Sequence, residues 1–169
     1  MLYLHKINIE TELGTIVAAS TKEGICILEF ADSKSLERKL DQIADFLKAN
    51  IVEDKNQHLE ALSHQLGEYF TQKRKEFDIP LDLYGTEFQK KVWMGLLKIP
   101  YGTTISYAKQ AARLCMPKAV RAVANANGQN KISIILPCHR VIGSDGTLTG
   151  YGGGLWRKQK LLKLENAYL

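Results

Sequence analysis

The sequence predicts a mixed α/β protein in two parts, a small N-terminal sheet-and-helix part and a mainly helical C-terminal part. Three observations support this class. Short β-rich segments come first, helical apolar spacings follow, and the balance of charge changes sign near residue 85. A chain of 169 residues has the length of one domain or two small ones. We therefore expect an N-terminal domain at 1–84, linker included, and a C-terminal domain at 85–169.

The N-terminal part begins with three expected strands at Tyr3–Ile9, Thr15–Ser20 and Ile25–Phe30. Turn residues at Glu12–Gly14 and Thr21–Gly24 separate them, which predicts a small antiparallel meander. Two amphipathic helices should follow, because apolar residues recur at helical spacing. Their expected buried faces are Leu36, Leu40, Ile43 and Leu47 in the first helix, and Leu59, Leu62, Leu66 and Tyr69 or Phe70 in the second. Gln72–Gly85 is the expected linker, since it is charged and then turn-like.

The C-terminal part should be helical from its start. Thr86 and Gln89 form a capping-box pattern, which opens a helix whose expected buried face is Phe88, Val92 and Leu96. A second helix is expected over Ser106–Leu114, then a tight break at Cys115–Met116. Pro117 should open a third helix that runs to about Ala126, with Gly128 just past its end. Two short helices around a tight turn match a helix-turn-helix, although plain helical bundles contain the same pairing.

The two parts carry opposite charge. Residues 1–84 hold 10 Lys and Arg against 15 Asp and Glu, whereas residues 85–169 hold 13 against three. Excess positive charge confined to one part is typical of a protein that binds a polyanion such as nucleic acid. The alternative is a surface charged for solubility, which normally intersperses both signs.

Several classes of protein are excluded by composition. No apolar run has the length of a membrane span, and the first residues do not follow the pattern of a secretory leader. Three cysteines do not build a disulfide framework, so we expect a cytoplasmic protein (or a nuclear one in a eukaryote). No spacing of His and Cys resembles a metal site, so we expect no metal and no cofactor. Cys26 and Cys115 are interpreted as packing residues.

Cys138 is the candidate reactive residue. It follows the apolar run Ile132–Leu136, which predicts a strand, and it precedes His139 and Arg140. The thiolate is the attacking species, and a neighbouring imidazole or cation favours it. Because neighbours in an extended chain point to opposite faces, Cys138 and His139 need an irregular backbone or a bridging water to communicate. The alternative is a buried cysteine beside a surface histidine.

Two further segments surround this centre. Gly143–Gly154 holds six glycines, which allows its backbone to approach a ligand closely, although a mobile hairpin loop has the same composition. The last helix is expected over Trp156–Asn166, and Glu165 is its only acid. This carboxylate either orients an imidazole or balances the neighbouring lysines Lys158, Lys160 and Lys163.

The segment Ile134–Ile142, which contains Pro137-Cys138-His139-Arg140, resembles the active-site signature of the O6-alkylguanine-DNA alkyltransferases, the methylated-DNA–protein-cysteine methyltransferases. The resemblance runs from Gly85 to Glu165 in the order and spacing of that family. Its other matches are Gly85–Gln89, Val92-Trp93, Ile105–Tyr107, Pro117–Val123, Asn130, Gly150-Tyr151 and Leu161-Leu162. The acidic part resembles the family's variable, ribonuclease-H-like N-terminal domain in layout alone.

The resemblance implies repair of DNA by direct reversal, with Cys138 as the nucleophile and permanent acceptor of the alkyl group of O6-alkylguanine. O4-alkylthymine is an alternative substrate of the same chemistry. His139 would act as base toward Cys138 through a water, and Glu165 would orient the imidazole. Tyr107 would donate a hydrogen bond to the purine as the alkyl group leaves, and Asn130 would brace the active-site segment. Because a thioether forms irreversibly, each molecule would react once.

The resemblance also implies double-stranded DNA carrying alkylated bases as the partner of a monomer, with the lesion base flipped out of the duplex. The implied DNA-binding residues are Lys118, Ala119, Arg121 and Ala122, of which Arg121 would fill the gap left by the flipped nucleotide. Tyr151 and the backbone around Gly152 would line the base pocket, and Val141 would offer a carbonyl to the guanine amine. In the family a glycine is common at the turn where Cys115 stands here.

Two other functions are consistent with some of these residues. A lesion-recognition or regulatory helix-turn-helix protein would bind without transfer chemistry, but relatives of that kind replace the cysteine. A cysteine hydrolase using Cys138, His139 and Glu165 would turn over repeatedly and would not depend on Arg121. The basic helical part is the feature that a hydrolase does not need.

Overall fold

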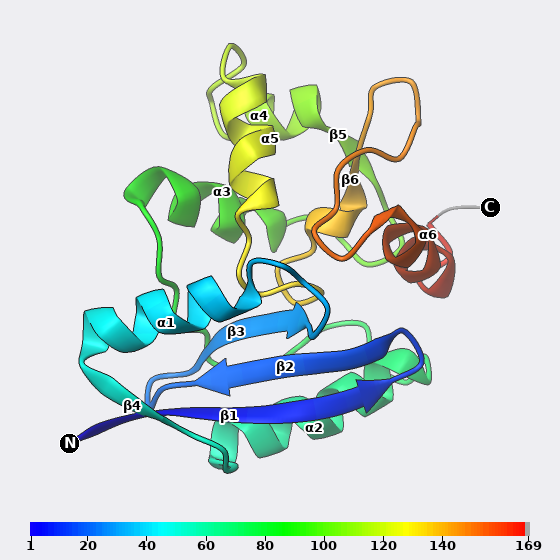
Figure 1. Cartoon of the computed structure of the whole chain (residues 1–169). Coiled ribbons are helices and arrows are strands. Elements are labelled where there is room, and N and C mark those ends of the chain that lie inside the picture. Colours follow the sequence, from blue (N-terminus) through cyan, green and yellow to red (C-terminus); the bar gives the residue numbers. More distant parts are fainter. Residues whose placement is uncertain (168–169) are drawn as a thin grey trace. The chain divides into compact units, whose positions relative to one another are not determined.

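The computed structural model describes residues 1–167, which form two compact units that divide between Tyr84 and Gly85 (Figure 1). The first unit combines a sheet with helices and the second is mainly helical, so the predicted mixed α/β class is confirmed. Within residues 1–167 no helix is long and apolar enough to span a membrane.

The sheet of the first unit contains the predicted meander. Strands β1 (Leu2–Thr11), β2 (Gly14–Ser20) and β3 (Ile25–Phe30) pair antiparallel in sequence order. A fourth strand, β4 (Ala49–Val52), pairs parallel with β1 and gives the order β3-β2-β1-β4. The sequence analysis missed β4, because four residues are too few to establish an alternation.

Helices α1 (Leu36–Leu47) and α2 (Gln57–Phe70) occupy the predicted ranges and cover the sheet (Figure 1). Leu36, Leu40 and Ile43 of α1 pack into an apolar cluster with residues of the sheet. All six residues of β3 are buried, so this strand shows no polar alternation.

Part of the predicted linker Gln72–Gly85 pairs with the edge strand β3 of the sheet. The Ile25 N–H donates to the Pro80 carbonyl at 2.9 Å, and the Asp82 N–H donates to the Ile25 carbonyl at 2.8 Å. These bonds form an isolated parallel bridge between Ile25 and Leu81. The linker prediction is wrong for Pro80–Asp82, because the outer edge of β3 needs backbone partners and this stretch supplies them.

The second unit opens with α3 (Glu87–Leu96), and the predicted capping box is present at its start. The Gln89 N–H donates to Thr86 Oγ1 at 3.1 Å, and the Thr86 N–H donates to Gln89 Oε1 at 3.0 Å. Val92 and Leu96 are buried as predicted, whereas Phe88 is half-buried. Trp93 is buried as well, and its indole N–H donates to the Ala126 carbonyl at 2.8 Å.

Helices α4 (Tyr107–Arg113) and α5 (Val120–Gly128) form the helix-turn-helix. Two buried amides hold them together, because Gln110 and Asn127 exchange hydrogen bonds of 2.9 and 2.7 Å. Cys115 in the turn has a φ of 61°, so the turn keeps the left-handed conformation that favours glycine. Cys115 is exposed, and its interpretation as a packing residue is therefore wrong.

The start of α5 differs from the prediction. The helix begins at Val120 and not at Pro117, because Pro117 and Lys118 belong to a turn in which the Ala119 N–H donates to the Met116 carbonyl at 2.9 Å. Its end is Gly128, two residues beyond the predicted end. Lys118 and Ala119 therefore precede the helix to which the sequence analysis assigned them.

The predicted strand Ile132–Leu136 is wrong as well, because only Ile132 takes part in a β-bridge and the residues that follow it form turns. Ile134 has a φ of 74°, a left-handed conformation that costs a β-branched residue about 1–3 kcal/mol. The side chain of Asn130 replaces the missing strand partner: its Oδ1 accepts from the Ile132 N–H at 2.9 Å and its Nδ2 donates to the Leu136 carbonyl at 2.8 Å. An apolar sequence cannot reveal that a side chain takes up the hydrogen bonds of its backbone.

The remaining elements are short. The 3₁₀-helix η1 (Cys138–Arg140) leads into β6 (Val141–Ile142), which pairs parallel with β5 (Ile105–Ser106). An irregular loop then runs to α6 (Leu155–Leu164), seen in orange to red in Figure 1. This helix ends one residue before Glu165, which is its C-cap.

Candidate active site

The two-residue ladder between β5 and β6 brings the candidate residues together. Tyr107 follows β5 directly and Cys138–Arg140 precedes β6, so the pairing of Ile105 with Val141 sets the start of α4 beside the cysteine segment. A cavity of about 460 Å³ lies there. Its lining residues are Tyr107, Val120, Arg121, Ala124, Asn127, Gly128, Cys138, Thr149, Gly150, Tyr151 and Gly152.

Cys138 lies half-buried in this cavity, and Asn130 contacts it from behind. The Asn130 Nδ2 donates to the Cys138 sulfur at 3.3 Å as well as to the Leu136 carbonyl. The same side chain therefore holds the turn before the cysteine and offers an N–H to the sulfur. A donated hydrogen bond favours the anionic form of its acceptor.

His139 is fully buried and sits on an irregular backbone, one of the two conditions that the sequence analysis set for communication with Cys138. Its Nε2 lies 2.8 Å from Oε2 of Glu165. The Nδ1 atom is also buried, and within residues 1–167 it has no hydrogen-bond partner. A neutral imidazole that donates through Nε2 carries its lone pair on Nδ1, so His139 offers a free basic nitrogen.

Arg140 completes a buried charged group with Glu165. Its Nε donates to Oε1 of Glu165 at 2.8 Å, and one terminal nitrogen donates to Oε2 at 3.1 Å. The other terminal nitrogen donates to the Ile99 carbonyl at 2.7 Å. The sequence analysis interpreted Arg140 as a cation beside the thiol; the guanidinium instead neutralises Glu165.

These contacts set the protonation states. Burial lowers the pKa of His139 below 6.5; the hydrogen bond and charge of Glu165 oppose this change, and the neighbouring Arg140 charge acts in the same direction as burial. Burial alone would raise the pKa of Glu165, but the hydrogen bond from His139 and the hydrogen bonds and charge of Arg140 outweigh it and hold that pKa well below its usual value. Near neutral pH the site therefore combines an ionised Glu165, a charged Arg140 and a neutral His139.

The structure places the other predicted residues in two groups. Tyr107, Arg121, Tyr151 and Gly152 line the cavity with Cys138. Val141 is buried and lies outside the lining. Three residues expected at a DNA interface also lie outside it, on the turn and on α5: Lys118, Ala119 and Ala122.

One residue of this region was missed by the sequence analysis. Lys158 is fully buried, and its Nζ donates to the Thr149 carbonyl at 2.7 Å. The sequence analysis treated it as one of several surface cations near Glu165. Its spacing of three and four residues from Leu161 and Leu162 places it on the apolar face of α6, a signal that was present in the sequence.

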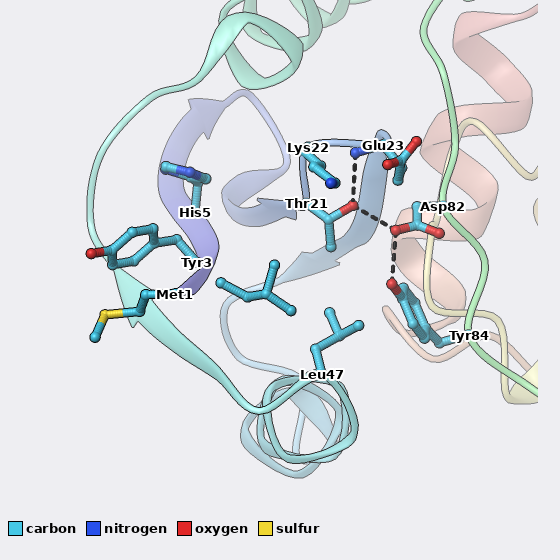
Figure 2. A pocket seen from close by; sticks show the side chains of 10 residues that line it. Met1, Tyr3, His5, Thr21, Lys22, Glu23, Leu47, Asp82 and Tyr84 are labelled. Carbon is cyan, nitrogen blue, oxygen red and sulfur yellow. Dashed lines mark hydrogen bonds between the residues drawn. The ribbon is translucent and has the colours of Figure 1, made fainter.

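A second cavity, of about 370 Å³, lies within the first unit (Figure 2). Three of its polar side chains satisfy one another, because the hydroxyls of Thr21 and Tyr84 both donate to Oδ2 of Asp82. No cysteine lines it. Among residues 1–167 no three His, Cys, Asp or Glu side chains gather as metal ligands would. The cavity at Cys138 is therefore the better candidate for chemistry.

Comparison with known proteins agrees with this assignment. A family model described as 6-O-methylguanine DNA methyltransferase, ribonuclease-like domain, matches residues 4–83. A second, described as 6-O-methylguanine DNA methyltransferase, DNA binding domain, matches residues 87–167.

Individual relatives carry a matching name. A methylated-DNA–protein-cysteine methyltransferase of Methanosarcina barkeri is 45% identical over 93% of this chain and 94% of its own length. A protein of the same name from Mycolicibacterium paratuberculosis is 59% identical over a shorter region, 62% of this chain and 63% of its own length. The crystal structure of Mycobacterium tuberculosis OGT in complex with DNA superposes with a TM-score of 0.82 at 40% identity, over 96% of this chain and 93% of that one.

Proposed function

The chain belongs to the 6-O-methylguanine DNA methyltransferase family, and on that premise we propose that it repairs DNA by moving the alkyl group of O6-alkylguanine to its own Cys138. The observation that carries the proposal is that Cys138, Tyr107 and Arg121 line one and the same cavity. The nucleophile, a donor for the leaving base and a cation on α5 are thus within reach of one ligand.

The transfer is a displacement at carbon. The neutral His139 takes the thiol proton through a water at its free Nδ1, and the Cys138 sulfur attacks the alkyl carbon. The carbon–sulfur bond forms as the bond from that carbon to O6 breaks, and the electron pair stays on the purine. The purine anion then takes a proton from water and His139 releases the thiol proton to water, so that a thiol and an alkylguanine become a thioether and guanine. Fixed donors around a developing charge accelerate such a step.

Each other residue has a part in this proposal. Asn130 favours the thiolate and holds the turn before Cys138. Glu165 keeps His139 in the tautomer that leaves Nδ1 free, and Arg140 keeps Glu165 ionised. Tyr107 donates to the leaving purine, and Tyr151 and Gly152 contact the base.

DNA carrying an alkylated base is the proposed partner. The base must leave the duplex to reach Cys138, at a cost of a few kcal/mol, and Arg121 on the rim of the cavity is placed to fill the gap. Lys118, Ala119 and Ala122 would face the duplex beside it, and contacts between basic residues and phosphates would make binding salt-dependent. Val141 directly follows the Cys138–Arg140 segment, and the proposal assigns its backbone carbonyl to the guanine amine.

We also propose a monomer in a reducing compartment such as the cytoplasm. Every residue named above comes from one chain, and all three cysteines are free thiols. The nucleophile must remain reduced to react. No cofactor has a part in the displacement, because the thiol and the substrate supply every atom.

Intact-protein mass spectrometry tests the proposal. The protein is incubated with excess duplex DNA containing one O6-methylguanine. We expect one methyl group per protein, on Cys138, with no further gain. Cys138→Ser should gain none. Arg121→Ala should react more slowly than Arg113→Ala, a matched loss of charge on the preceding helix, while the reaction of Cys138 with iodoacetamide stays unchanged.

Other outcomes would favour other functions. Selective binding of the lesion duplex with no gain of mass would indicate a recognition protein. Repeated turnover of an ester or peptide, independent of Arg121, would indicate a cysteine hydrolase.

A further inference from the structure

The wall of the candidate active-site cavity includes a turn that has little rigidity of its own. The Gly154 N–H donates to the Tyr151 carbonyl at 2.9 Å, which closes a turn with Gly152 and Gly153 at its centre. Tyr151 and Gly152 line the cavity. Glycine has no Cβ atom to restrict its backbone, so three glycines in succession must be held from outside if this wall is to keep one shape.

Helix α6 follows this turn directly and supplies two side chains that hold it (Figure 1). One terminal nitrogen of Arg157 donates to the Gly153 carbonyl at 3.2 Å. The indole of Trp156 lies against Gly154, because a Cβ atom added to that glycine would lie 3.2 and 3.3 Å from Cδ1 and Nε1 of the indole. Gly153 and Gly154 are not among the residues that line the cavity, so both contacts restrain the turn without occupying the pocket.

Arg157 and Trp156 also hold each other. The central carbon of the guanidinium lies 4.6 Å from the centre of the indole ring, within the range of a cation–π interaction. Arg157 is 6% exposed, whereas Trp156 is 53% exposed. A buried guanidinium and an exposed indole therefore form one stacked pair, and this pair contacts two successive residues of the turn.

The Arg157 side chain is not needed to begin the helix. The Gly154 carbonyl already accepts from the backbone N–H groups of Arg157 and Lys158, at 3.1 and 3.2 Å. The side-chain bond to Gly153 therefore adds a restraint on the turn, which lies before the helix and beside the pocket.

We propose that Arg157 is a positioning residue for the lesion base: together with Trp156 it clamps the turn Tyr151–Gly154, so that the wall formed by Tyr151 and Gly152 is in place before the base enters. The inference rests on the proposed function. A wall that is already ordered costs no ordering entropy when the base binds. Loss of the clamp should therefore weaken capture of the base and leave the displacement at Cys138 nearly unchanged.

The test compares Arg157→Met with Lys160→Met, which removes an exposed charge from the same helix. Single-turnover transfer is measured at increasing concentrations of a duplex that contains O6-methylguanine, which gives a maximal rate and a half-saturating concentration. For Arg157→Met we expect the half-saturating concentration to rise at least about fivefold, with a maximal rate within about twofold of the wild-type rate. The Kd for an undamaged duplex should stay unchanged. Lys160→Met should keep the wild-type half-saturating concentration.

Further variants separate positioning from a general loss of structure. Arg157→Lys keeps a donor for Gly153 but lacks the planar group that stacks on the indole, so it should recover part of the loss. Trp156→Ala should raise the half-saturating concentration as well, whereas Leu155→Ala, which removes a similarly exposed apolar side chain, should not. Partial unfolding would instead lower the number of methyl groups accepted per protein.

The outcomes are distinct. If the wild-type protein takes the methyl group and Arg157→Met has the wild-type half-saturating concentration, this inference alone is overturned. Equal weakening of the lesion duplex and the undamaged duplex overturns it too, because Arg157 would then contact the DNA backbone. If Arg157→Met does not fold, Trp156→Ala decides between the same outcomes. A wild-type protein that takes no methyl group overturns the proposed function, and this inference with it.

Discussion

Glu165→Gln is the substitution with the largest expected effect on stability. Glu165 has a fully buried side chain, and its two oxygens accept three hydrogen bonds, one from His139 and two from Arg140. Glutamine keeps the shape but offers one acceptor oxygen and no charge. The Arg140 guanidinium, 7% exposed, would remain in the interior without its counter-ion. Removing one partner of a buried ion pair costs roughly 3–5 kcal/mol.

Urea unfolding measures this loss selectively. Both tryptophans, Trp93 and Trp156, belong to the second unit, so their fluorescence reports the unfolding of residues 85–169. With a slope of roughly 1–3 kcal/mol per molar urea, the midpoint should fall by roughly 2 M. Glu87→Gln is the matched control, because the Glu87 side chain is 97% exposed and its substitution should change the unfolding free energy by less than about 0.5 kcal/mol.

The pH dependence provides a second check. The folded pKa of Glu165 lies below its ordinary value, so the stability from this carboxylate is present above that value and is lost as the pH falls through the folded pKa. The difference between wild type and Glu165→Gln should therefore be constant above about pH 6 and shrink only in acid. A Glu165→Gln midpoint equal to that of Glu87→Gln would refute the assignment of Glu165 as a desolvated counter-ion.

Three further predictions concern the same unit. His139 is the only histidine of the second unit, and its pKa in the folded protein lies below 6.5, so the unfolded chain binds one more proton in acid. The unfolding free energy should therefore decrease by up to about 1.4 kcal/mol for each pH unit below 6.5. Urea midpoints for His139→Gln should lack this slope, and an equal slope would contradict the prediction. Asn130→Ala should lower the unfolding free energy by about 2–4 kcal/mol, because the Ile132 N–H and the Leu136 carbonyl lose their side-chain partner. Asn125→Ala, at an exposed site of α5, should differ little from wild type in the same urea unfolding assay. Position 115 has a φ of 61°, a left-handed conformation that glycine adopts readily and a β-branched residue does not. Cys115→Gly should therefore raise the unfolding free energy by up to about 1 kcal/mol, and Cys115→Val should lower it. Melting temperatures in the opposite order would show that the left-handed turn is not strained.

Much of the fold followed from local patterns. The three antiparallel strands, the helices α1 and α2 and the capping box of α3 were predicted because each depends on residues close together in the chain. Three of the errors have the opposite property. Strand β4, the bridge at Leu81 and the turn at Ile134 depend on partners distant in sequence or on a side chain that replaces a backbone partner.

By itself, the sequence singled out Cys138 and His139 as the candidate reactive centre, because a cysteine followed directly by a histidine and an arginine is visible without any knowledge of the fold. It also separated the acidic part from the basic part, since net charge is a sum over residues and needs no fold. Glu165 remained open between two interpretations, and Lys158 was taken for a surface cation.

The tertiary structure alone decided those two cases. It pairs Glu165 with Arg140 and His139 across 25 and 26 residues, and it buries Lys158 between α6 and the wall of the cavity. The physical reason is that the energy of a charge depends on its solvation and on its neighbours in space. Packing determines both quantities, and the order of residues along the chain does not.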